Sequence, residues 1–178
     1  MIKLIKLNLI LLFLMLQSPM IYDFNADSNL KDWQIVNDGV MGGLSTSELS
    51  LTEEGHGLFK GHVTTENNGG FASVMLSTFI ELEKPNDSIT IRVKGDGKKY
   101  QLRLKSTKQQ YQSYIQTFKT NGDWQTLTFS LNEFVPSFRG RQLDLPNFNF
   151  DKIEEVRFLI ANKKEQDFEL LIDNIYIE

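Results

Sequence analysis

The stretch SITIRVKGDGKKYQLRLKS, residues 88–106, decides the fold class of this chain. Apolar side chains occupy every second position on both sides of a central turn: Ile89, Ile91 and Val93 before it, and Tyr100, Leu102 and Leu104 after it. Such alternation places the apolar side chains of a segment on one face and is typical of a half-buried β-strand. The dipeptide Asp96-Gly97 between the two halves is one that tight hairpin turns favour. We therefore predict that residues 88–94 and 99–105 are strands that pair antiparallel.

The same alternation continues on both sides of this stretch. Further strands are predicted at residues 21–24, 33–36, 46–51, 58–63, 71–77, 111–118, 124–131, 156–160 and 168–178. The only helical turn expected lies near residues 27–31, capped by Asp27 or Ser28. About eleven short strands separated by turns predict an all-β sandwich or jelly roll of two antiparallel sheets, with very little helix. The longest irregular segment, residues 133–151, is a candidate functional loop.

Length and composition limit the classes of protein to consider. The chain has 178 residues, a formal net charge of −4, 13 Phe and no Cys. This length fits one domain with a sizeable core. The acidic balance, without a block of Lys and Arg, gives no reason to expect nucleic acid as a partner. The absence of cysteine excludes disulfides, thiolate metal sites and thiol catalysis.

Residues 1–20 form a separate apolar segment. Lys3 and Lys6 precede a short apolar run, which is the layout of a secretory signal. The run is short for ~30 Å of hydrocarbon, so we expect no stable transmembrane span, and a permanent membrane helix is the weaker alternative. Residues 21–178 are predicted to be a single domain, exported to the periplasm or the extracellular space if residues 1–20 act as a signal. If translation starts at Met20, the domain is cytoplasmic.

Catalytic and metal-binding patterns are missing from the sequence. The only histidines are His56, expected in an exposed turn, and His62, and no nucleophile motif or metal-ligand spacing accompanies them. In residues 23–28, DFNADS, polar side chains alternate as in a calcium loop, but Ser28 stands where an EF-hand has glycine. We expect these residues to cap a turn, with a structural calcium as the alternative. The prediction is a protein that is not an enzyme and has no cofactor.

The segment VNDGVMGGLS, residues 36–45, contains three glycines, a methionine and a carboxylate. It matches neither G-x-G-x-x-G nor the P-loop pattern, so a nucleotide site is not indicated. We expect its glycines to adopt positive φ or to allow close backbone approach. Asp38, Met41 and Ser45 are predicted to form part of a recognition surface.

Five motifs resemble those of the complex I intermediate-associated protein family. In order along the chain they are WQIVNDGVMGGLSTSEL, FKGHVTTENNGGFASV, VKGDGKKYQLRL, FVPSFRGR and IDNIYIE. The resemblance implies a galactose-binding-like jelly-roll β-sandwich without a catalytic centre. It also implies chaperone-like binding of assembly intermediates of respiratory NADH:ubiquinone oxidoreductase. The matching positions are Trp33, Asp38, Gly39, Met41, Gly42, Gly43, Ser45, Gly69, Gly70, Phe71, Gly95, Asp96, Gly97, Tyr100, Phe138, Arg139 and Gly140.

The first functional hypothesis is a non-catalytic module that binds a protein partner. Its candidate surface consists of residues 36–45, 67–71 and 133–151. The predicted binding residues are Asp38, Met41, Gly42, Gly43, Ser45, Phe71, Arg139 and Arg141. The two arginines could pair with carboxylates of the partner, or they could form an internal salt bridge to Asp173.

The alternative hypothesis is an exported carbohydrate-binding module. Residues 1–20 lack the arginines typical of a mitochondrial transit peptide, which favours export. Sugar sites need aromatic platforms with nearby polar groups. The rings available are Tyr111, Tyr114, Trp124 and Phe138, although all four are expected in the core because apolar alternation surrounds them.

Overall fold

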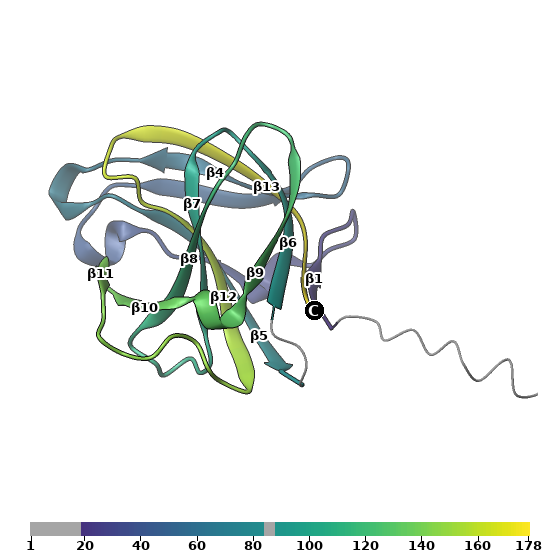
Figure 1. Cartoon of the computed structure of the whole chain (residues 1–178). Coiled ribbons are helices and arrows are strands. Elements are labelled where there is room, and N and C mark those ends of the chain that lie inside the picture. The colour runs from purple at the N-terminus through teal and green to yellow at the C-terminus, as the bar shows by residue number, and fades with distance from the viewer. Residues whose placement is uncertain (1–18, 84–87) are drawn as a thin grey trace, which may run out of the picture.

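Two antiparallel sheets packed face to face make up the computed structural model, which describes residues 19–83 and 88–178 (Figure 1). Sheet A has the strand order β3-β4-β13-β6-β9, with β1 also paired to β13. Its strands are β1 (Met20–Asp23), β3 (Thr46–Leu51), β4 (Gly57–Val63), β6 (Ser88–Gly95), β9 (Trp124–Ser130) and β13 (Gln166–Ile177). The all-β sandwich predicted from the sequence is confirmed.

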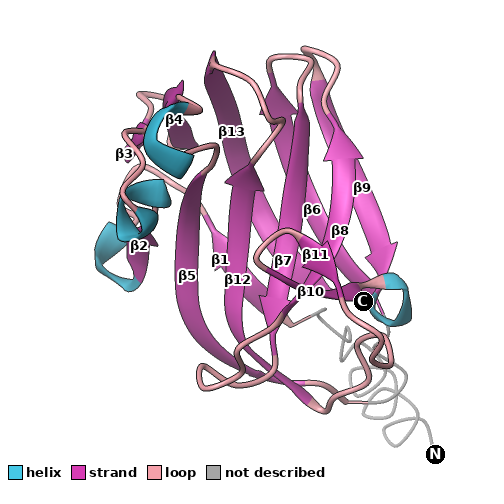
Figure 2. Ribbon diagram, turned by 90° about the vertical axis from the view of Figure 1, so that its left-hand side faces the viewer, coloured by secondary structure: helices cyan, strands magenta, loops and turns pink. Residues whose placement is uncertain are grey.

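Sheet B has the order β11-β10-β8-β7-β12-β5-β2 and lies in front of sheet A in Figure 2. Its strands are β2 (Trp33–Ile35), β5 (Ala72–Glu81), β7 (Lys99–Lys105), β8 (Ser113–Lys119), β10 (Val135–Phe138), β11 (Arg141–Gln142) and β12 (Lys152–Ile160). Short 3-10 turns join some of these strands: η1 (Leu30–Asp32), η2 (Asp38–Met41), η3 (Glu66–Asn68) and η4 (Leu131–Glu133). Every strand predicted from alternation has a counterpart in one of the two sheets.

The core lies between the sheets and is built from the alternating apolar positions. Fully buried side chains include Phe59, Ile91 and Ile172 of sheet A and Val74, Leu102 and Phe158 of sheet B. Burial of each such side chain contributes about 1.5–3 kcal/mol relative to leaving it exposed. The intervening residues point away from the core, so each sheet has an outer face made of the polar half of the pattern.

The hairpin predicted for residues 88–105 is wrong. β6 lies in sheet A between β13 and β9, whereas β7 lies in sheet B between β8 and β12. The Asp96-Gly97 turn therefore carries the chain from one sheet to the other, with Gly97 at a φ of 82°. Alternation specifies which face of a strand is buried but not its partner, because strands in opposite sheets can turn their apolar faces toward the same core.

Two local predictions also need correction. The helical turn expected near residues 27–31 is η1, and it is capped by Asn29, whose side chain accepts a hydrogen bond from the backbone N–H of Lys31. Part of the loop expected at residues 133–151 forms β10 and β11, which extend sheet B. Strands this short show too little alternation to be recognised in the sequence.

The predicted signal at residues 1–20 lies almost wholly outside the described residues, which begin at Pro19. None of the helical segments in residues 19–83 and 88–178 has the length and apolar character that a membrane span requires.

Candidate functional site

Asp38 is the centre of a buried hydrogen-bond network at the margin of sheet B next to β2. Its side chain is fully buried and accepts hydrogen bonds from the backbone N–H groups of Ser45, Gly70 and Phe71 at 3.0, 2.7 and 3.1 Å. The Ser45 hydroxyl is a fourth donor. Burial by itself would raise the pKa of Asp38, but these hydrogen bonds outweigh it and hold the pKa below its ordinary value. The carboxylate thus fixes the 36–45 loop against the turn that precedes β5.

The glycines of this region are required by the same network. A Cβ on Gly43 would lie 2.4 Å from the Asp38 carboxylate, and a Cβ on Gly69 would lie 2.9 Å from it. Gly42 has a φ of 88°, in the left-handed region that disfavours other residues. We conclude that these glycines allow the backbone to close around the Asp38 carboxylate. They do not form a phosphate loop.

The predicted recognition residues of this loop therefore divide into two groups. Asp38 and Ser45 are buried, at 0% and 7% exposure, so the expectation that they face a partner does not hold. Met41 and the neighbouring Leu44 are exposed, at 51% and 55%. Phe71 is half-buried, and its backbone N–H belongs to the network around Asp38.

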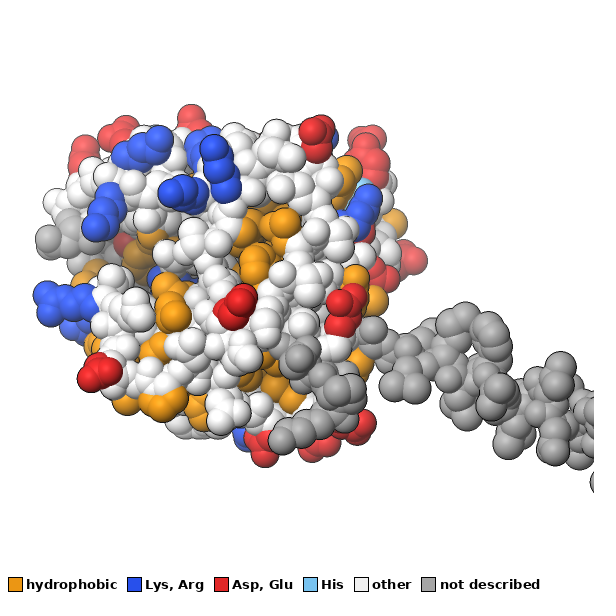
Figure 3. All heavy atoms as spheres, viewed as in Figure 1, with side chains coloured by type: hydrophobic (Ala, Val, Ile, Leu, Met, Phe, Trp, Pro, Cys, Tyr) orange, Lys and Arg blue, Asp and Glu red, His pale blue; other side chains and the backbone are white. Residues whose placement is uncertain are grey.

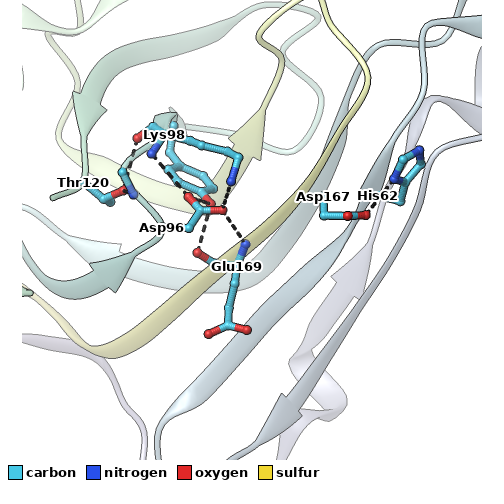
Figure 4. Close-up of polar contacts among 8 residues, drawn as sticks. His62, Asp96, Lys98, Thr120, Asp167 and Glu169 are labelled. Atoms are coloured by element: carbon cyan, nitrogen blue, oxygen red, sulfur yellow. Dashed lines mark hydrogen bonds and ion pairs between the residues drawn. The ribbon is translucent and has the colours of Figure 1, made fainter. Parts of the chain in front are cut away.

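A second aspartate, Asp96, organises the crossover from β6 to β7 (Figure 4). Its carboxylate accepts hydrogen bonds from the Lys98 ammonium at 2.6 Å and from the backbone N–H of Glu169 at 2.9 Å. The Tyr100 hydroxyl lies 2.9 Å from the Asp96 carboxylate and 3.0 Å from the Glu169 carbonyl oxygen. Burial, followed by the nearby Asp96 charge, raises the pKa of Tyr100. The hydrogen bonds of Asp96 and Tyr100 to Glu169 therefore connect the crossover to β13.

A cleft of about 530 Å³ opens beside this crossover on the outer face of sheet A. Its charged lining residues are Glu48, Lys60, Asp96, Lys98, Asp167 and Glu169. The two lysines are paired within the cleft, Lys60 with Glu48 at 3.3 Å and Lys98 with Asp96 at 2.6 Å. Nearby, a hydrogen bond to Asp167 raises the pKa of the exposed His62. The cleft contains both signs of charge, largely paired and open to solvent.

The outer face of sheet B carries charged side chains that are mostly buried. Arg103 on β7 lies directly opposite Arg157 on β12, and Lys105 lies opposite Glu155 in the next row. The side chains of Arg157 and Lys105 are each 16% exposed, and that of Glu155 is 7% exposed. The Glu155 carboxylate lies 3.0 Å from the Arg157 guanidinium and 3.9 Å from the Lys105 ammonium.

Arg103 has a neutral partner instead of a carboxylate. Its Nε and Nη2 atoms donate to the side-chain oxygen of Gln101 at 2.9 and 2.7 Å. In the part of the chain that the structure describes, no carboxylate lies within 4.0 Å of this guanidinium. Burial, then the positive charge of Arg157, lowers the pKa of Arg103 to about 10, with Glu155 acting in the opposite direction. Arg103 therefore stays charged at neutral pH, at a cost in free energy.

An aromatic pair borders this face at the β10–β11 hairpin. Tyr111 is 61% exposed and Phe138 is 37% exposed, and their rings meet edge to face at 5.3 Å. The guanidinium of Arg139 lies over the Phe138 ring at 5.2 Å. The expectation that Tyr111 and Phe138 are core residues is wrong, because both lie at the end of the sheet where no second layer covers them. Tyr114, at 3% exposure, is in the core as expected.

The internal salt bridge considered for Arg139 and Arg141 is not formed. Asp173 lies on the outer face of sheet A, where Arg92 approaches it at 2.6 Å and His56 at 2.9 Å. Both candidate arginines are exposed, in and beside β11. In Figure 3, Lys and Arg side chains gather next to β11 and along the top of the molecule.

Two residues near Asp173 also lie elsewhere than expected. His56 is half-buried and not in an exposed turn, because its ring packs on Trp124 at 4.6 Å. The Arg92 guanidinium covers the same indole at 4.6 Å. Trp124 is thus neither a core residue nor an open platform for a sugar.

The predicted surface is therefore divided by the sheet. The 36–45 loop and η3 lie at the margin next to β2, Arg139 and Arg141 lie at the margin formed by β11, and the outer face of sheet B lies between them (Figure 2). The residues that sequence reasoning missed are Gln101, Arg103, Glu155 and Arg157. In the sequence these residues are the polar positions of two alternating strands. Such positions look the same as those of any solvent-exposed face.

Metal-binding side chains do not converge anywhere in residues 19–83 or 88–178, where no group of three or more His, Asp or Glu could hold an ion. In the segment considered for calcium, the Asn25 side chain instead accepts a hydrogen bond from the backbone N–H of Asp27.

Comparison of the chain with known protein families gives a match over most of its length. The model of the complex I intermediate-associated protein 30 (CIA30) family matches residues 22–172. The chain belongs to this family. A relative from Drosophila melanogaster, "Complex I intermediate-associated protein 30, mitochondrial", is 25% identical over 194 residues. The alignment covers 95% of this chain and 66% of the relative, so this CIA30-family chain spans about two thirds of that relative's length.

Solved structures with the same fold include carbohydrate-binding modules. The family 11 module of Clostridium thermocellum, bound to a mixed-linked tetrasaccharide, has a TM-score of 0.62 at 15% identity, over 90% of this chain and 96% of that one. The agarase AgWH50C has a TM-score of 0.63 at 13% identity, over 90% of this chain and 26% of that one. These similarities support the galactose-binding-like β-sandwich.

Proposed function

We propose that this domain is a non-catalytic module that binds a protein during assembly of respiratory complex I, in a chaperone-like manner. The family match over residues 22–172 carries this proposal, because it spans almost the whole sandwich. The assembly role itself is taken from the name of the mitochondrial relative, of which this chain covers 66%.

The outer face of sheet B is the surface that best suits such a partner. Exposed apolar side chains stand at both margins, Met41 and Leu44 on one and Tyr111 and Phe138 on the other. Charged groups lie between them on the sheet. Met and aromatic side chains are enriched in protein interfaces relative to the rest of a protein surface. The outer face of sheet A offers instead a cleft of paired, solvated charges.

Affinity capture from the native host tests this proposal. The tagged wild-type domain is expected to recover subunits of the respiratory complex, and Met41→Ser with Tyr111→Ser should reduce the recovery at least tenfold. Leu58→Ser, which removes an apolar side chain from the outer face of sheet A, is the matched control and should recover as much as the wild type. Capture of no respiratory subunit by the wild-type domain would refute the assembly role.

A carbohydrate-binding module is the second candidate, and the exposed ring pair of Tyr111 and Phe138 favours it. Aromatic rings beside polar groups are the usual components of a sugar site. A glycan array probed with the wild-type domain and with Tyr111→Ala decides this candidate. Binding that Tyr111→Ala abolishes supports it, and an array without a hit removes it.

The cellular compartment bears on both candidates. We propose export if residues 1–20 are removed as a signal, and a cytoplasmic domain if translation starts at Met20. Fractionation of the host, followed by sequencing of the mature N-terminus, separates these two outcomes.

A further inference from the structure

The uncompensated charge on the outer face of sheet B points to the chemistry of the ligand. We propose that Arg103 and Arg157 together bind a carboxylate side chain of the protein partner. This inference rests on the proposed function insofar as it takes the partner to be a protein. It goes further by placing a carboxylate of the partner on the outer face of sheet B.

The charges on this face are unequal. Arg103, Arg157 and Lys105 stand around the single carboxylate of Glu155. One oxygen of Glu155 accepts from Arg157, 3.1 Å from its Nε, and the other faces Lys105. Glu155 is thus committed to two cations, and Arg103 is left with the neutral amide of Gln101.

Ion pairs within the fold account for Arg157 and Lys105 but give no reason for Arg103. Like charges directly opposite each other on neighbouring strands are destabilising. Removing a guanidinium from water is also costly unless an anion or several acceptors compensate for it. An apolar side chain at the position of Arg103 would remove the repulsion, whereas Arg157 pairs with the buried Glu155 carboxylate. A bound anion would relieve both the repulsion and the desolvation.

The geometry around Arg103 suits a planar anion. Gln101 engages Nε and one N–H of Nη2, which orients the guanidinium and leaves the Nη1 donors without an acceptor among the described residues. One Nη1 N–H and the second N–H of Nη2 form the fork that a carboxylate accepts with both oxygens. On the adjacent strands Ile115 lies opposite Arg103 and Met75 lies opposite Arg157, whose Nη2 is 3.1 Å from the Met75 sulfur. Neither of these neighbours offers a carboxylate to the guanidinium groups.

The margins of the face favour a polypeptide as the source of the carboxylate. Met41 and Leu44 on one side, and Tyr111 and Phe138 on the other, are apolar and exposed. They can pack against apolar residues that flank an acidic side chain in a peptide. A free phosphate or an acidic sugar would match the arginines but would leave at least the aliphatic margin unused.

A peptide titration tests the inference directly. The probe is a capped synthetic peptide of Glu, Leu and Gly, with a control peptide in which Gln replaces Glu. We expect the acidic peptide to shift the Nε–Hε resonances of Arg103 and Arg157 in a ¹⁵N NMR spectrum, and the Gln peptide to leave them unchanged. Arg103→Gln should weaken binding at least tenfold, whereas Lys94→Gln, the same charge loss on the outer face of sheet A, should change it less than twofold.

The stability of the variant separates a ligand role from a structural one. Because Arg103 has no carboxylate partner, Arg103→Gln is expected to unfold at the same urea concentration as the wild type or at a higher one. A lower unfolding midpoint would mean that Arg103 supports the fold, and it would overturn the proposal. Equal binding of the acidic peptide to Arg103→Gln and to the wild type would overturn it as well.

Two competitors identify the source of the carboxylate. Neither inorganic phosphate nor polygalacturonate is expected to displace the acidic peptide at equal charge concentration, and displacement by either would reject a protein carboxylate as the ligand. Host capture keeps this inference distinct from the proposed function. Capture of respiratory subunits by both the wild type and Arg103→Gln would reject the carboxylate site alone, whereas failure of the wild type to capture any would reject the assembly role alone.

Discussion

Two regions of this molecule bury a charge, and they treat it in opposite ways. The Asp38 carboxylate is surrounded by four donors, which lower its pKa and stabilise its charged form. The Arg103 guanidinium has only a neutral acceptor, and burial, followed by the positive charge of Arg157 opposite it, lowers its pKa and destabilises its charged form. The donors to Asp38 all belong to the domain itself, so this buried charge needs no partner from outside. A charge that the fold leaves uncompensated calls for a partner from outside.

The largest expected effect is at the satisfied charge. Asp38→Ala leaves three backbone N–H groups of the loop without an acceptor and should destabilise the domain by about 3 kcal/mol. Urea unfolding monitored by tryptophan fluorescence measures the change. A loss below about 1 kcal/mol would mean that water or another group replaces the carboxylate, and the contrast with Arg103 would then weaken.

Crowding around the same carboxylate should have the next largest effect. A Cβ on Gly43 would lie 2.4 Å from Asp38 and 2.7 Å from the backbone of Gly69, so Gly43→Ala should cost about 2 kcal/mol. Gly39→Ala, at a position with no atom within 4 Å of the added Cβ, is the matched control and should cost far less. Similar losses for both variants would show that the loop is not closed around Asp38.

The pH dependence of stability tests the electrostatics at Asp38. Because its folded pKa lies below the unfolded value, its contribution is fully present above the unfolded pKa and is lost as the pH falls through the folded pKa. Urea midpoints measured from pH 7 down to pH 2 should therefore fall more steeply at the acid end for the wild type than for Asp38→Asn. Parallel curves would mean that Asp38 does not have a depressed pKa.

At Arg103 the expected change in the free energy of unfolding is the smallest, and it has the opposite sign because the fold does not compensate this charge. Arg103→Met removes the repulsion with Arg157 and should leave the free energy of unfolding unchanged or raise it by up to about 1 kcal/mol. The same urea experiment measures it. Arg92→Met is the contrasting variant, since it removes the partner of Asp173 at 2.6 Å and should be destabilising.

The sequence predicted the strands of this fold well, but not how they pair. Alternation in residues 88–106 identified both strands, yet the choice between a hairpin and a crossover depended on contacts with β9, β13, β8 and β12. The glycine-rich loop was recognised as a backbone feature. The sequence does not reveal that Asp38 is buried, because its burial depends on donors from the distant turn that precedes β5.

The candidate site was largely beyond reach of sequence reasoning. An outward arginine on an alternating strand is ordinary in a single sequence, and only the sheet register places Arg103 opposite Arg157. The sequence identifies Tyr111 and Phe138 as available rings but predicts them in the core, whereas both are exposed. Their exposure followed from the end of the sheet, which no local pattern reveals.

Site-specific photo-crosslinking tests most directly the claim that the outer face of sheet B is the binding face. A photoreactive phenylalanine derivative is introduced at Tyr111, and at Leu58 on the outer face of sheet A as the control, and each variant is irradiated in the native host. We predict crosslinks to a respiratory-complex subunit from position 111 and none from position 58. Crosslinks from position 58 with none from position 111 would contradict the account.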